Sequence, residues 1–440
     1  MDDIFKPVNF NSALKAQVTA EIIATDPQSG SHNYFGVKVT LSQTYNHDVT
    51  VTGYIFDEGG GFNANHPFTL TVPTGELTAE TPLNFYETDP TASAAVDNIG
   101  IVYTYAGVSI TYEFNACILK FNSLADANAV LNQLEADYDN YNDDYDSQYP
   151  NLTEEQLDDM DEQNGFDEFQ NFKDFENIFG GFCSKRANIE ATEIAWLANN
   201  FTGTDPDDID LTFDDAENTI FNSSYSFKIG NDLYQLTSSG MYKNGVLQDE
   251  GGNARIFKKV TEIMDHGELS NSWGKYSGPM PLINSIGFLN NKYQSESEFP
   301  LFMTDCKSNK RSKEKEEYDN GKQRIKIKVA INSIVVRNGV HGKVVHYKSK
   351  NGNWKRSRTD MAVLCGGTYY TNQCNDSQQF TDRTPVNGFK KRKQISTRRH
   401  SPGHIPVQGT VWKTYTTQIA SSIDMPNIPS NIIGTLPLTF

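Results

Sequence analysis

The sequence predicts a mainly β, multidomain protein with an α/β middle region, an N-terminal immunoglobulin-like β-sandwich and a C-terminal antiparallel β domain. Short segments of alternating apolar and polar residues fill both ends of the chain, whereas the middle changes to helical spacing. The length of 440 residues is sufficient for about three domains of ordinary size. We therefore expect a β-sandwich at residues 1–116, an acidic mixed α/β domain at 117–300 and a basic β-rich domain at 301–440.

Six alternating segments predict the strands of the N-terminal sandwich. Clusters of Gly, Pro, Asn and Asp separate them, and Ala106-Gly107 marks a hairpin turn between the last two. Sandwiches of this type usually bind, space or assemble rather than catalyse. The segments are Val18–Ile23, Phe35–Leu41, Val49–Ile55, Phe68–Val72, Ile101–Tyr105 and Val108–Tyr112.

The middle region begins with an amphipathic helix, for which Ser123 is the expected N-cap. Its apolar face is formed by Leu124, Ala127, Val130, Leu131 and Leu134. After an acidic run, the sequence Thr153-Glu-Glu-Gln156 predicts a capping box and a second short helix. Another helix is expected from Ile189 to Asn199, and a β-hairpin from Tyr225 to Leu236 turns over Gly230-Asn231.

Strands return in the C-terminal region. From Arg324 to Ile331, basic and apolar residues alternate over the first five positions, which predicts one core face and one cationic face. Asn338-Gly339 and Asn351-Gly352 predict hairpin turns. The stretch from Pro426 to Phe440, rich in Pro, Asn and Ile, predicts an extended tail.

Charge is divided unequally along the chain. Residues 1–250 contain 42 acidic and 9 basic residues, whereas residues 251–440 contain 14 acidic and 29 basic residues. This separation is suited to head-to-tail contact between molecules, to an anionic partner at the basic end, or to neutralisation within one molecule. The sequence leaves these three uses open.

The five cysteines are too few and too widely spaced to predict a disulfide framework or a zinc site. Only Cys365 and Cys374 are close enough for a local bridge, and buried free thiols are the preferred interpretation. No stretch reaches the roughly 18 apolar residues of a membrane span, and the first residues lack the pattern of a secretory signal. We expect a soluble chain without an export signal, or one from which such a signal was removed.

Parts of the middle and C-terminal regions resemble poorly characterised secreted or surface proteins of Bacteroidota. The resemblance lies in Leu119–Leu131, Gly181–Ser184, Ile220–Leu236 and the basic segment Trp354–Met361. It covers residues 119–420 and brings no known catalytic residues. It therefore implies a location outside the cytoplasm, and the missing signal segment departs from it.

An acidic, tyrosine-containing run is a candidate calcium site, because hard cations prefer several oxygen ligands. It lacks the turn glycine and the closing glutamate of an EF-hand loop. A solvated acidic connector is the alternative interpretation, and Asp205–Asp210 is a second calcium candidate. The carboxylates of the first run are Asp137, Asp139, Asp143, Asp144 and Asp146.

Clustered cations in the last third of the chain are candidates for binding an anionic partner. Tyr347, Trp354 and Phe389 lie among them as possible stacking groups for nucleic acid. An acidic protein, a glycan or a neighbouring subunit is the favoured partner, because the acidic half of the chain repels nucleic acid at long range. The candidate residues are Lys355, Arg356, Arg358, Lys390, Lys391, Arg392, Lys393, Arg398 and Arg399.

Two histidine pairs, His341 with His346 and His400 with His404, are close enough in sequence for a metal or a nuclease-like site. Neither pair has a third ligand nearby, so an ordinary surface role is preferred. No phosphate-binding loop, nucleophile elbow or zinc-protease motif is present in the sequence. These observations favour a protein without enzymatic activity.

The leading hypothesis is a non-enzymatic binding or assembly protein of a bacterial surface or extracellular machine, which uses its opposed charges for protein or glycan contact. One alternative is a cargo effector or toxin with a basic, nucleic-acid-directed C-terminal domain. Another is a structural component of a phage or injection particle. The expected location is extracellular or cell surface, and the alternatives are cytoplasmic or particle-associated.

Overall fold

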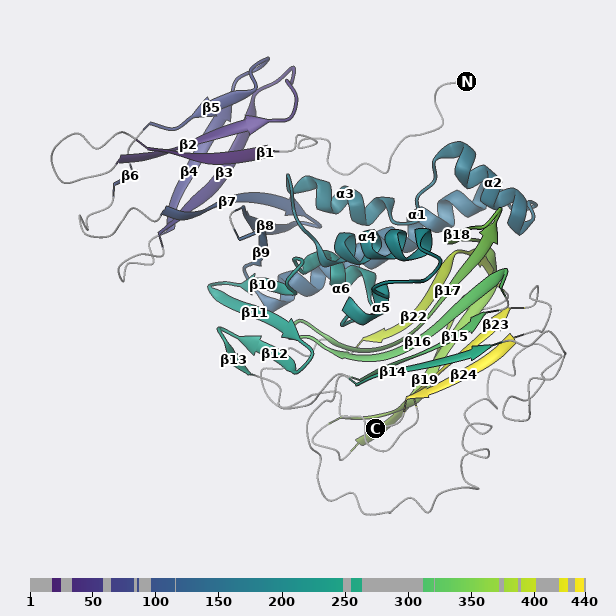
Figure 1. Cartoon of the computed structure of the whole chain (residues 1–440). Coiled ribbons are helices and arrows are strands. Elements are labelled where there is room, and N and C mark those ends of the chain that lie inside the picture. Colours follow the sequence, from purple (N-terminus) through teal and green to yellow (C-terminus); the bar gives the residue numbers. More distant parts are fainter. Residues whose placement is uncertain are drawn as a thin grey trace. The chain divides into compact units, whose positions relative to one another are not determined.

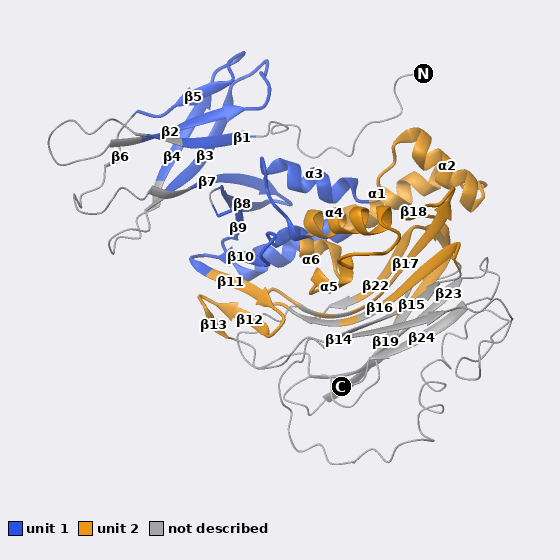
Figure 2. Cartoon of the chain, in the orientation of Figure 1, with its two compact units in different colours: residues 1–135, 169–185, 219–232 blue, residues 136–168, 186–218, 233–440 orange. Residues whose placement is uncertain are grey.

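The computed structural model describes residues 18–24, 34–57, 65–82, 85–86, 96–114, 116–247, 255–262, 312–319, 321–371, 376–386, 389–400, 419–425 and 432–438. The prediction of a mainly β chain with an α/β middle region is confirmed (Figure 1). The chain divides into two compact units, each made of three separated segments (Figure 2). Unit 1 contains residues 1–135, 169–185 and 219–232, and unit 2 contains residues 136–168, 186–218 and 233–440. This division differs from the three consecutive domains that the sequence predicts.

Unit 1 contains two sheets, and each of the six predicted N-terminal segments falls on a strand. In the first sheet, β2 pairs with β1, β5 and β6, all antiparallel. The part of the second sheet in unit 1 has the order β10-β9-β8-β7-β3-β4, and only β9 and β10 are parallel. The strands are β1 (Val18–Ala24), β2 (Tyr34–Leu41), β3 (Val49–Asp57), β4 (Asn65–Val72), β5 (Thr78–Glu80), β6 (Phe85–Tyr86), β7 (Val96–Tyr105), β8 (Val108–Glu113), β9 (Ile118–Phe121) and β10 (Ser226–Ile229).

The period of two residues explains these strands. Phe68, Leu70 and Val72 of β4 are buried, whereas the threonines between them face outward. Gly53 of β3 is required by close packing, since a Cβ atom there would lie 2.3 Å from the carbonyl oxygen of Gly100. The alternation therefore determines which side of each strand enters the core.

Helical segments complete unit 1. Helix α1 (Leu124–Ser147) begins as predicted, because the Ser123 hydroxyl accepts a hydrogen bond from the Asp126 amide at 3.1 Å. Helix α3 (Gln170–Ile178) brings aromatic rings onto β7, and the ring centroids of Phe175 and Tyr105 are 4.9 Å apart. Phe179 packs edge-on against Tyr103 at 5.0 Å.

A disulfide joins Cys117, just before β9, to Cys183, just after α3. The expectation of unpaired thiols is wrong for these two residues. They are 66 residues apart in sequence, so spacing did not reveal a pair that the fold brings together within unit 1. The Cys365–Cys374 bridge falls partly outside the described residues, because Cys374 is not among them.

Unit 2 places helices on one side of a six-stranded sheet (Figure 1). This sheet has the order β14-β15-β16-β17-β18, with β22 also paired to β17. A five-stranded sheet has the order β20-β19-β23-β24, with β21 paired to β19, and β11, β12 and β13 form a meander. The helices are the last part of α1, α2 (Glu154–Asn164), α4 (Lys185–Ala198), α5 (Pro206–Ile209) and α6 (Asp215–Ile220).

In unit 2, the described strands of the predicted C-terminal domain pair antiparallel, whereas β14, which precedes that domain, pairs in parallel with β15. The strands are β11 (Asp232–Thr237), β12 (Gly240–Lys243), β13 (Val246–Leu247), β14 (Arg255–Glu262), β15 (Ser312–Asp319), β16 (Gln323–Ser333), β17 (Asn338–Lys350), β18 (Asn353–Arg356), β19 (Thr359–Thr371), β20 (Asp376–Thr384), β21 (Lys390–Arg392), β22 (Gln394–His400), β23 (Ile419–Met425) and β24 (Ile432–Leu438).

The turn predictions had mixed outcomes. Asn351-Gly352 does turn between β17 and β18, with positive φ at both residues. Asn338-Gly339 instead begins strand β17, because the preceding turn is closed by mutual backbone hydrogen bonds between Ile334 and Arg337. Part of the predicted C-terminal tail, Ile432–Leu438, is strand β24 and pairs with β23.

Candidate functional site

The candidate site is a layer of buried charge pairs in unit 2. Its cations come from strands β16 and β17 and the turn between them, where Lys326 is fully buried and Lys328, Arg337 and Lys343 are nearly so. Ile325 and Ile327, which alternate with these lysines, are buried as well. The predicted cationic face therefore exists, but acidic segments of the same unit cover it.

Lys326 is held by two carboxylates at the start of α5. Its Nζ atom lies 3.0 Å from Asp205 Oδ1 and 2.8 Å from Asp207 Oδ2, and 3.9 Å from the centre of the Trp196 ring. Asp205 is also the N-cap of α5, accepting a hydrogen bond from the Asp207 amide at 3.0 Å. At this second calcium candidate, a lysine ammonium lies against the carboxylates.

Lys328 shares Asp207 with Lys326. Burial lowers the pKa of Lys328, but the negative charges of Asp207 and Asp210 outweigh it and raise that pKa above its usual value. Lys328 is consequently charged at neutral pH. The buried ammonium groups thus act as the counterions of α5.

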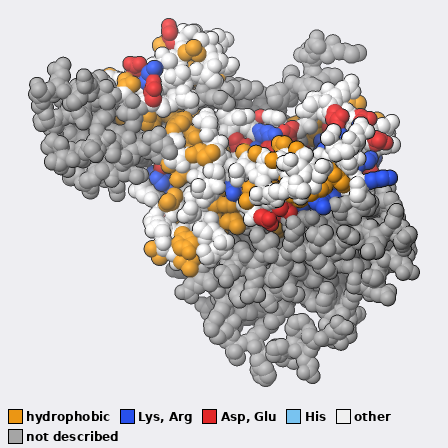
Figure 3. All heavy atoms as spheres, viewed as in Figure 1, with side chains coloured by type: hydrophobic (Ala, Val, Ile, Leu, Met, Phe, Trp, Pro, Cys, Tyr) orange, Lys and Arg blue, Asp and Glu red, His pale blue; other side chains and the backbone are white. Residues whose placement is uncertain are grey.

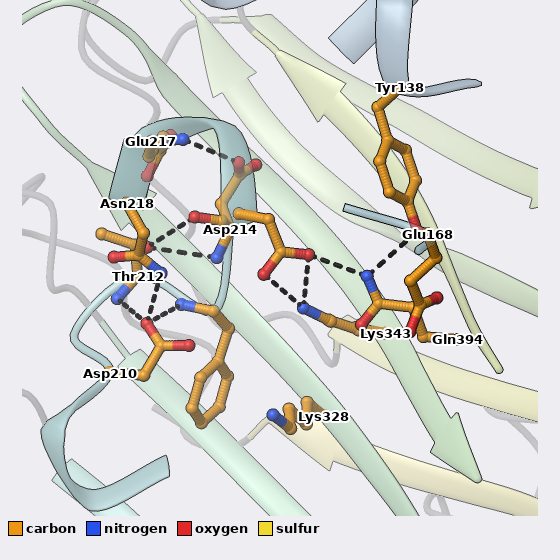
Figure 4. Close-up of polar contacts among 12 residues, drawn as sticks. Tyr138, Glu168, Asp210, Thr212, Asp214, Glu217, Asn218, Lys328, Lys343 and Gln394 are labelled. Atoms are coloured by element: carbon orange, nitrogen blue, oxygen red, sulfur yellow. Dashed lines mark hydrogen bonds and ion pairs between the residues drawn. The ribbon is translucent and has the colours of Figure 1, made fainter. Parts of the chain in front are cut away.

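The loop after α5 folds around its own carboxylates (Figure 4). Asp210 Oδ1 accepts hydrogen bonds from the amides of Thr212 and Phe213 at 3.1 and 2.8 Å, and from Asn218 Nδ2 at 2.9 Å. Asp214 caps α6 through the Glu217 amide at 3.0 Å. These local bonds hold the acidic side chains in position for the cations of the sheet.

Two cations, Arg337 and Lys343, contact the acidic residues at the end of this loop. Arg337 contacts Asp214 at 3.4 Å and Glu217 at 3.1 Å, from strand-side positions that are both buried. Lys343 lies 2.7 Å from Asp215 (Figure 4). Burial raises the pKa of the Asp215 carboxyl, but Lys343 outweighs it and holds the pKa well below the usual aspartate value.

Arg356 of β18 joins two glutamates. Its Nη2 and Nε atoms lie 2.6 and 3.0 Å from Glu193 Oε2, and Nη1 lies 3.0 Å from Glu168 Oε1. The Tyr347 hydroxyl also donates to Glu193, at 2.5 Å. Burial acts to raise the pKa of both carboxyls. At Glu193, the contacts with Arg356 and Tyr347 outweigh burial, and the net pKa is below the usual glutamate value. At Glu168, burial outweighs the contact with Arg356, and the net pKa is above that value.

Arg358 joins two carboxylates and two aromatic rings. It binds Asp161 with two hydrogen bonds of 2.8 and 3.0 Å, and Asp146 with a third of 2.8 Å. Its guanidinium also lies 5.5 and 5.2 Å from the centres of the Tyr145 and Phe166 rings. A planar, permanently charged side chain satisfies all of these contacts at once.

The acidic run predicted as a calcium site or a solvated connector belongs to helix α1, which continues to Ser147. The connector interpretation is therefore wrong. Asp143 pairs with Lys390 and Arg392, and Asp146 pairs with Arg358 and Arg392. Within the residues that the structure describes, no group of three or more potential ligands is placed to hold a metal ion. Calcium binding by Asp137, Asp139 and Asp144 stays an untested prediction.

The cations predicted to bind an external anion are brought together, but against acceptors of their own unit. Arg399 lies in β22, and its side chain is outside the described residues. On the face shown in Figure 3, basic and acidic side chains lie side by side at the right of the described surface. The other pairings are Lys355 with Glu162, Lys390 with Asp143, Lys391 with the Leu152 carbonyl, Lys393 with Asp161, and Arg398 with Asp214.

Sequence reasoning did not single out Glu193 or Lys343, which hold central positions in this layer. No local motif marks either residue. The available signal was the division of charge along the chain, which left three uses open. The ion pairs described in unit 2 correspond to one of them, neutralisation within one molecule.

The histidines of β17 are not on the surface. His341 and His346 are both 2% exposed, so the predicted surface role is wrong. The Nδ1–H group of His346 donates to the Ser357 carbonyl at 2.9 Å, and its buried Nε2 atom has no hydrogen-bond partner among the described residues. Burial outweighs this hydrogen bond and the charge of Glu154, and lowers the pKa of His346 to about 4 from the usual 6.5.

His346 should make the protein less stable in acid. Between pH 6.5 and about 4, the unfolded chain binds a proton at this residue and the folded chain does not, so stability is present above pH 6.5 and is lost as the pH falls to 4. The loss attributable to His346 is about 3 kcal/mol. Urea unfolding at pH 7.5 and 4.5 measures it. We expect His346→Gln to have a smaller acid loss than wild type; equal losses would contradict the assignment.

No helix in the described part of the chain is long and apolar enough to cross a membrane. No known protein family and no curated protein matches the sequence. Among solved structures, the chain is similar to a DUF4848 family protein from Bacteroides thetaiotaomicron, with 9% identity and a TM-score of 0.16. The alignment covers 75% of this chain and 100% of that protein. A likeness at this level does not support a fold or a function.

Proposed function

We propose that this protein is a non-enzymatic binding or assembly protein that acts outside the cytoplasm, on a bacterial surface or in an extracellular machine. The observation that carries this proposal is the charge layer of unit 2. Its carboxylates lie against lysine and arginine side chains of the same unit, as Asp215 lies 2.7 Å from Lys343 and Glu193 lies 2.6 Å from Arg356. Groups locked in such pairs hold a structure together and are poor proton donors or acceptors at neutral pH.

The Cys117–Cys183 disulfide supports a location in an oxidising compartment. Disulfides persist on cell surfaces and in extracellular or periplasmic proteins, and are rare in the cytosol of most organisms. The internal pairing of the basic residues also disfavours the nucleic-acid alternative, because those cations are not presented as an open groove.

We further propose that the two N-terminal sheets of unit 1 form an immunoglobulin-like sandwich that contacts a protein partner or a glycan. Both sheets have the alternating pattern that buries one face of each strand, seen in Phe68, Leu70 and Val72. Outward-facing threonines, including Thr50, Thr52, Thr69 and Thr71, supply hydroxyl groups for polar contacts. Such sandwiches usually serve recognition or assembly.

The location is tested by protease treatment of intact cells that make the native protein, followed by mass spectrometry under non-reducing conditions. We expect released peptides from unit 1 and a linked peptide pair containing Cys117 and Cys183. A protein that is protected inside cells, with both thiols reduced, would overturn the proposal. Photo-crosslinking from position 52, compared with exposed position 144 of α1, then tests whether the threonine face contacts a partner.

A further inference from the structure

Helix α2 is docked in unit 2 almost entirely by its carboxylates. Its buried residues are Leu157, Asp158 and Asp161, so a single apolar side chain enters the interior. A helix on the surface of a globular protein normally buries an apolar stripe about 100° wide. The attachment of α2 therefore depends on charge and hydrogen bonding more than on apolar burial.

The acidic groups that face the strands recur at helical spacing. Glu154 accepts hydrogen bonds from the Asp360 amide at 2.6 Å and the Thr359 hydroxyl at 3.1 Å. Asp158 accepts from the Arg358 amide at 2.9 Å and from the Ser357 hydroxyl.

One turn further on, Asp161 lies 2.8 Å from Arg358 and 2.7 Å from Lys393. Positions 154, 158 and 161 lie on one side of a helix. The strands thus contact one acidic face.

A second row of pairs lies at the rim. Asp159 is 2.9 Å from Lys350, with side chains 60% and 48% exposed, and Glu162 pairs with Lys355. Exposed pairs of this kind contribute little to stability and are screened by salt. They nevertheless match the charge of an incoming acidic helix, so they favour its encounter with the strands.

The cations beneath α2 are positioned by other parts of unit 2. Arg358 Nη1 lies 2.8 Å from Asp146 of α1 and donates to the Lys391 carbonyl at 2.7 Å. Arg392 is bound by the same Asp146 at 3.0 Å. These contacts do not involve α2, so Arg358 and Arg392 keep them when α2 moves away.

Helix α2 also carries its own end caps. Thr153 and Gln156 form the predicted capping box, and Gly165, with φ of 64°, donates its amide to the Asp161 carbonyl. The backbone groups at both ends of α2 are capped by residues adjacent to the helix. The helix can therefore separate from the strands and stay helical. Phe166 stays stacked on Tyr145, with ring centroids 3.8 Å apart, which tethers the C-terminal end.

We propose that the strand surface beneath α2 is a receptor for an acidic helix of a partner protein, and that α2 occupies it as an internal competitor. The receptor surface consists of Lys350 of β17, Lys355 of β18, Ser357, Arg358, Thr359 of β19 and Lys393. This inference rests on the proposed binding function and specifies the chemistry of the partner. The partner presents carboxylates at positions i, i+4 and i+7 of a helix.

The test uses the full-length chain and a fluorescent peptide with the sequence of residues 150–166. The double variant Asp158→Asn, Asp161→Asn weakens the internal competitor, so it should bind the peptide at least about tenfold more tightly than wild type, as measured by fluorescence anisotropy. The control variant Asp144→Asn, on the exposed side of α1, should bind like wild type. A peptide with amides at positions 154, 158 and 161 should lose most of its affinity.

Hydrogen exchange of the wild-type chain provides the second measurement, which does not require a folded variant. Excess acidic peptide should speed exchange at residues 154–164 and leave residues 124–134 unchanged. Equal affinities of wild type and double variant, or peptide binding without faster exchange in α2, would overturn the inference. Absence of binding would do the same. If the peptide binds as expected but the protease experiment finds the protein inside cells, the proposed location is rejected and the receptor surface is still supported.

Discussion

Replacing Lys326 with methionine is expected to destabilise unit 2 by about 3–5 kcal/mol. The substitution keeps most of the side-chain volume and removes the ammonium that lies 3.0 Å from Asp205 and 2.8 Å from Asp207. Lys328 still pairs with Asp207, whereas Asp205 loses the ammonium that lies 3.0 Å from its Oδ1 atom. A buried carboxylate that loses a charged partner is costly because the interior solvates it poorly. Urea unfolding at pH 7 measures the loss.

Lys350→Met is the matched control for this prediction. It removes the same type of charge from a pair whose side chains are 48% and 60% exposed, so the expected loss is small compared with that of Lys326→Met. The contrast between the two variants, measured in one buffer, isolates the effect of burial. Similar small losses for both would show that the charge layer is not a major source of stability.

Removing the disulfide is expected to have the second large effect, on unit 1. The bond closes a loop of 66 residues, and the loop-entropy relation predicts that the variant Cys117→Ala, Cys183→Ala loses about 4 kcal/mol. The bond joins the turn before β9 to the segment after α3, so it restricts the unfolded chain over much of the helical region. Denaturant unfolding followed through the tyrosines of unit 1 measures the change.

A reducing agent supplies the control for the disulfide. Dithiothreitol should lower the stability of the wild type to nearly that of the double alanine variant, and should leave the variant unchanged. A wild type that is insensitive to reduction would contradict the prediction, as would a variant as stable as the oxidised wild type.

Local patterns predicted much of the fold. The period-two segments located β1, β2, β3, β4, β7 and β8, and the apolar face from Leu124 to Leu134 located the start of α1. The same reasoning ended that helix too early. Repeated aspartates after residue 136 are unfavourable in an isolated helix, and their compensation comes from Arg358 and Arg392, more than 200 residues away.

Only the cations of the candidate site could be predicted from the sequence, because their acidic partners are distant along the chain. The cations Arg356, Arg358 and Arg392 were identified from their clustering, but their partners are distant and carry no motif. Cys117 and Cys183 also pair across a long separation. Composition shows that opposite charges exist, whereas only the fold shows which of them meet.

The order of these partners along the chain has a consequence for biosynthesis. Lys326, the partner of Asp205, is synthesised 121 residues after it, and Lys343, the partner of Asp215, is synthesised 128 residues after it. At about 5–20 residues per second, the ribosome needs roughly 6–25 s to make that intervening stretch. During this interval the acidic segment has been synthesised without its counterions, so the charge layer forms late, after β16 and β17 emerge. Premature termination before residue 326 would therefore leave a strongly negative chain that cannot complete unit 2.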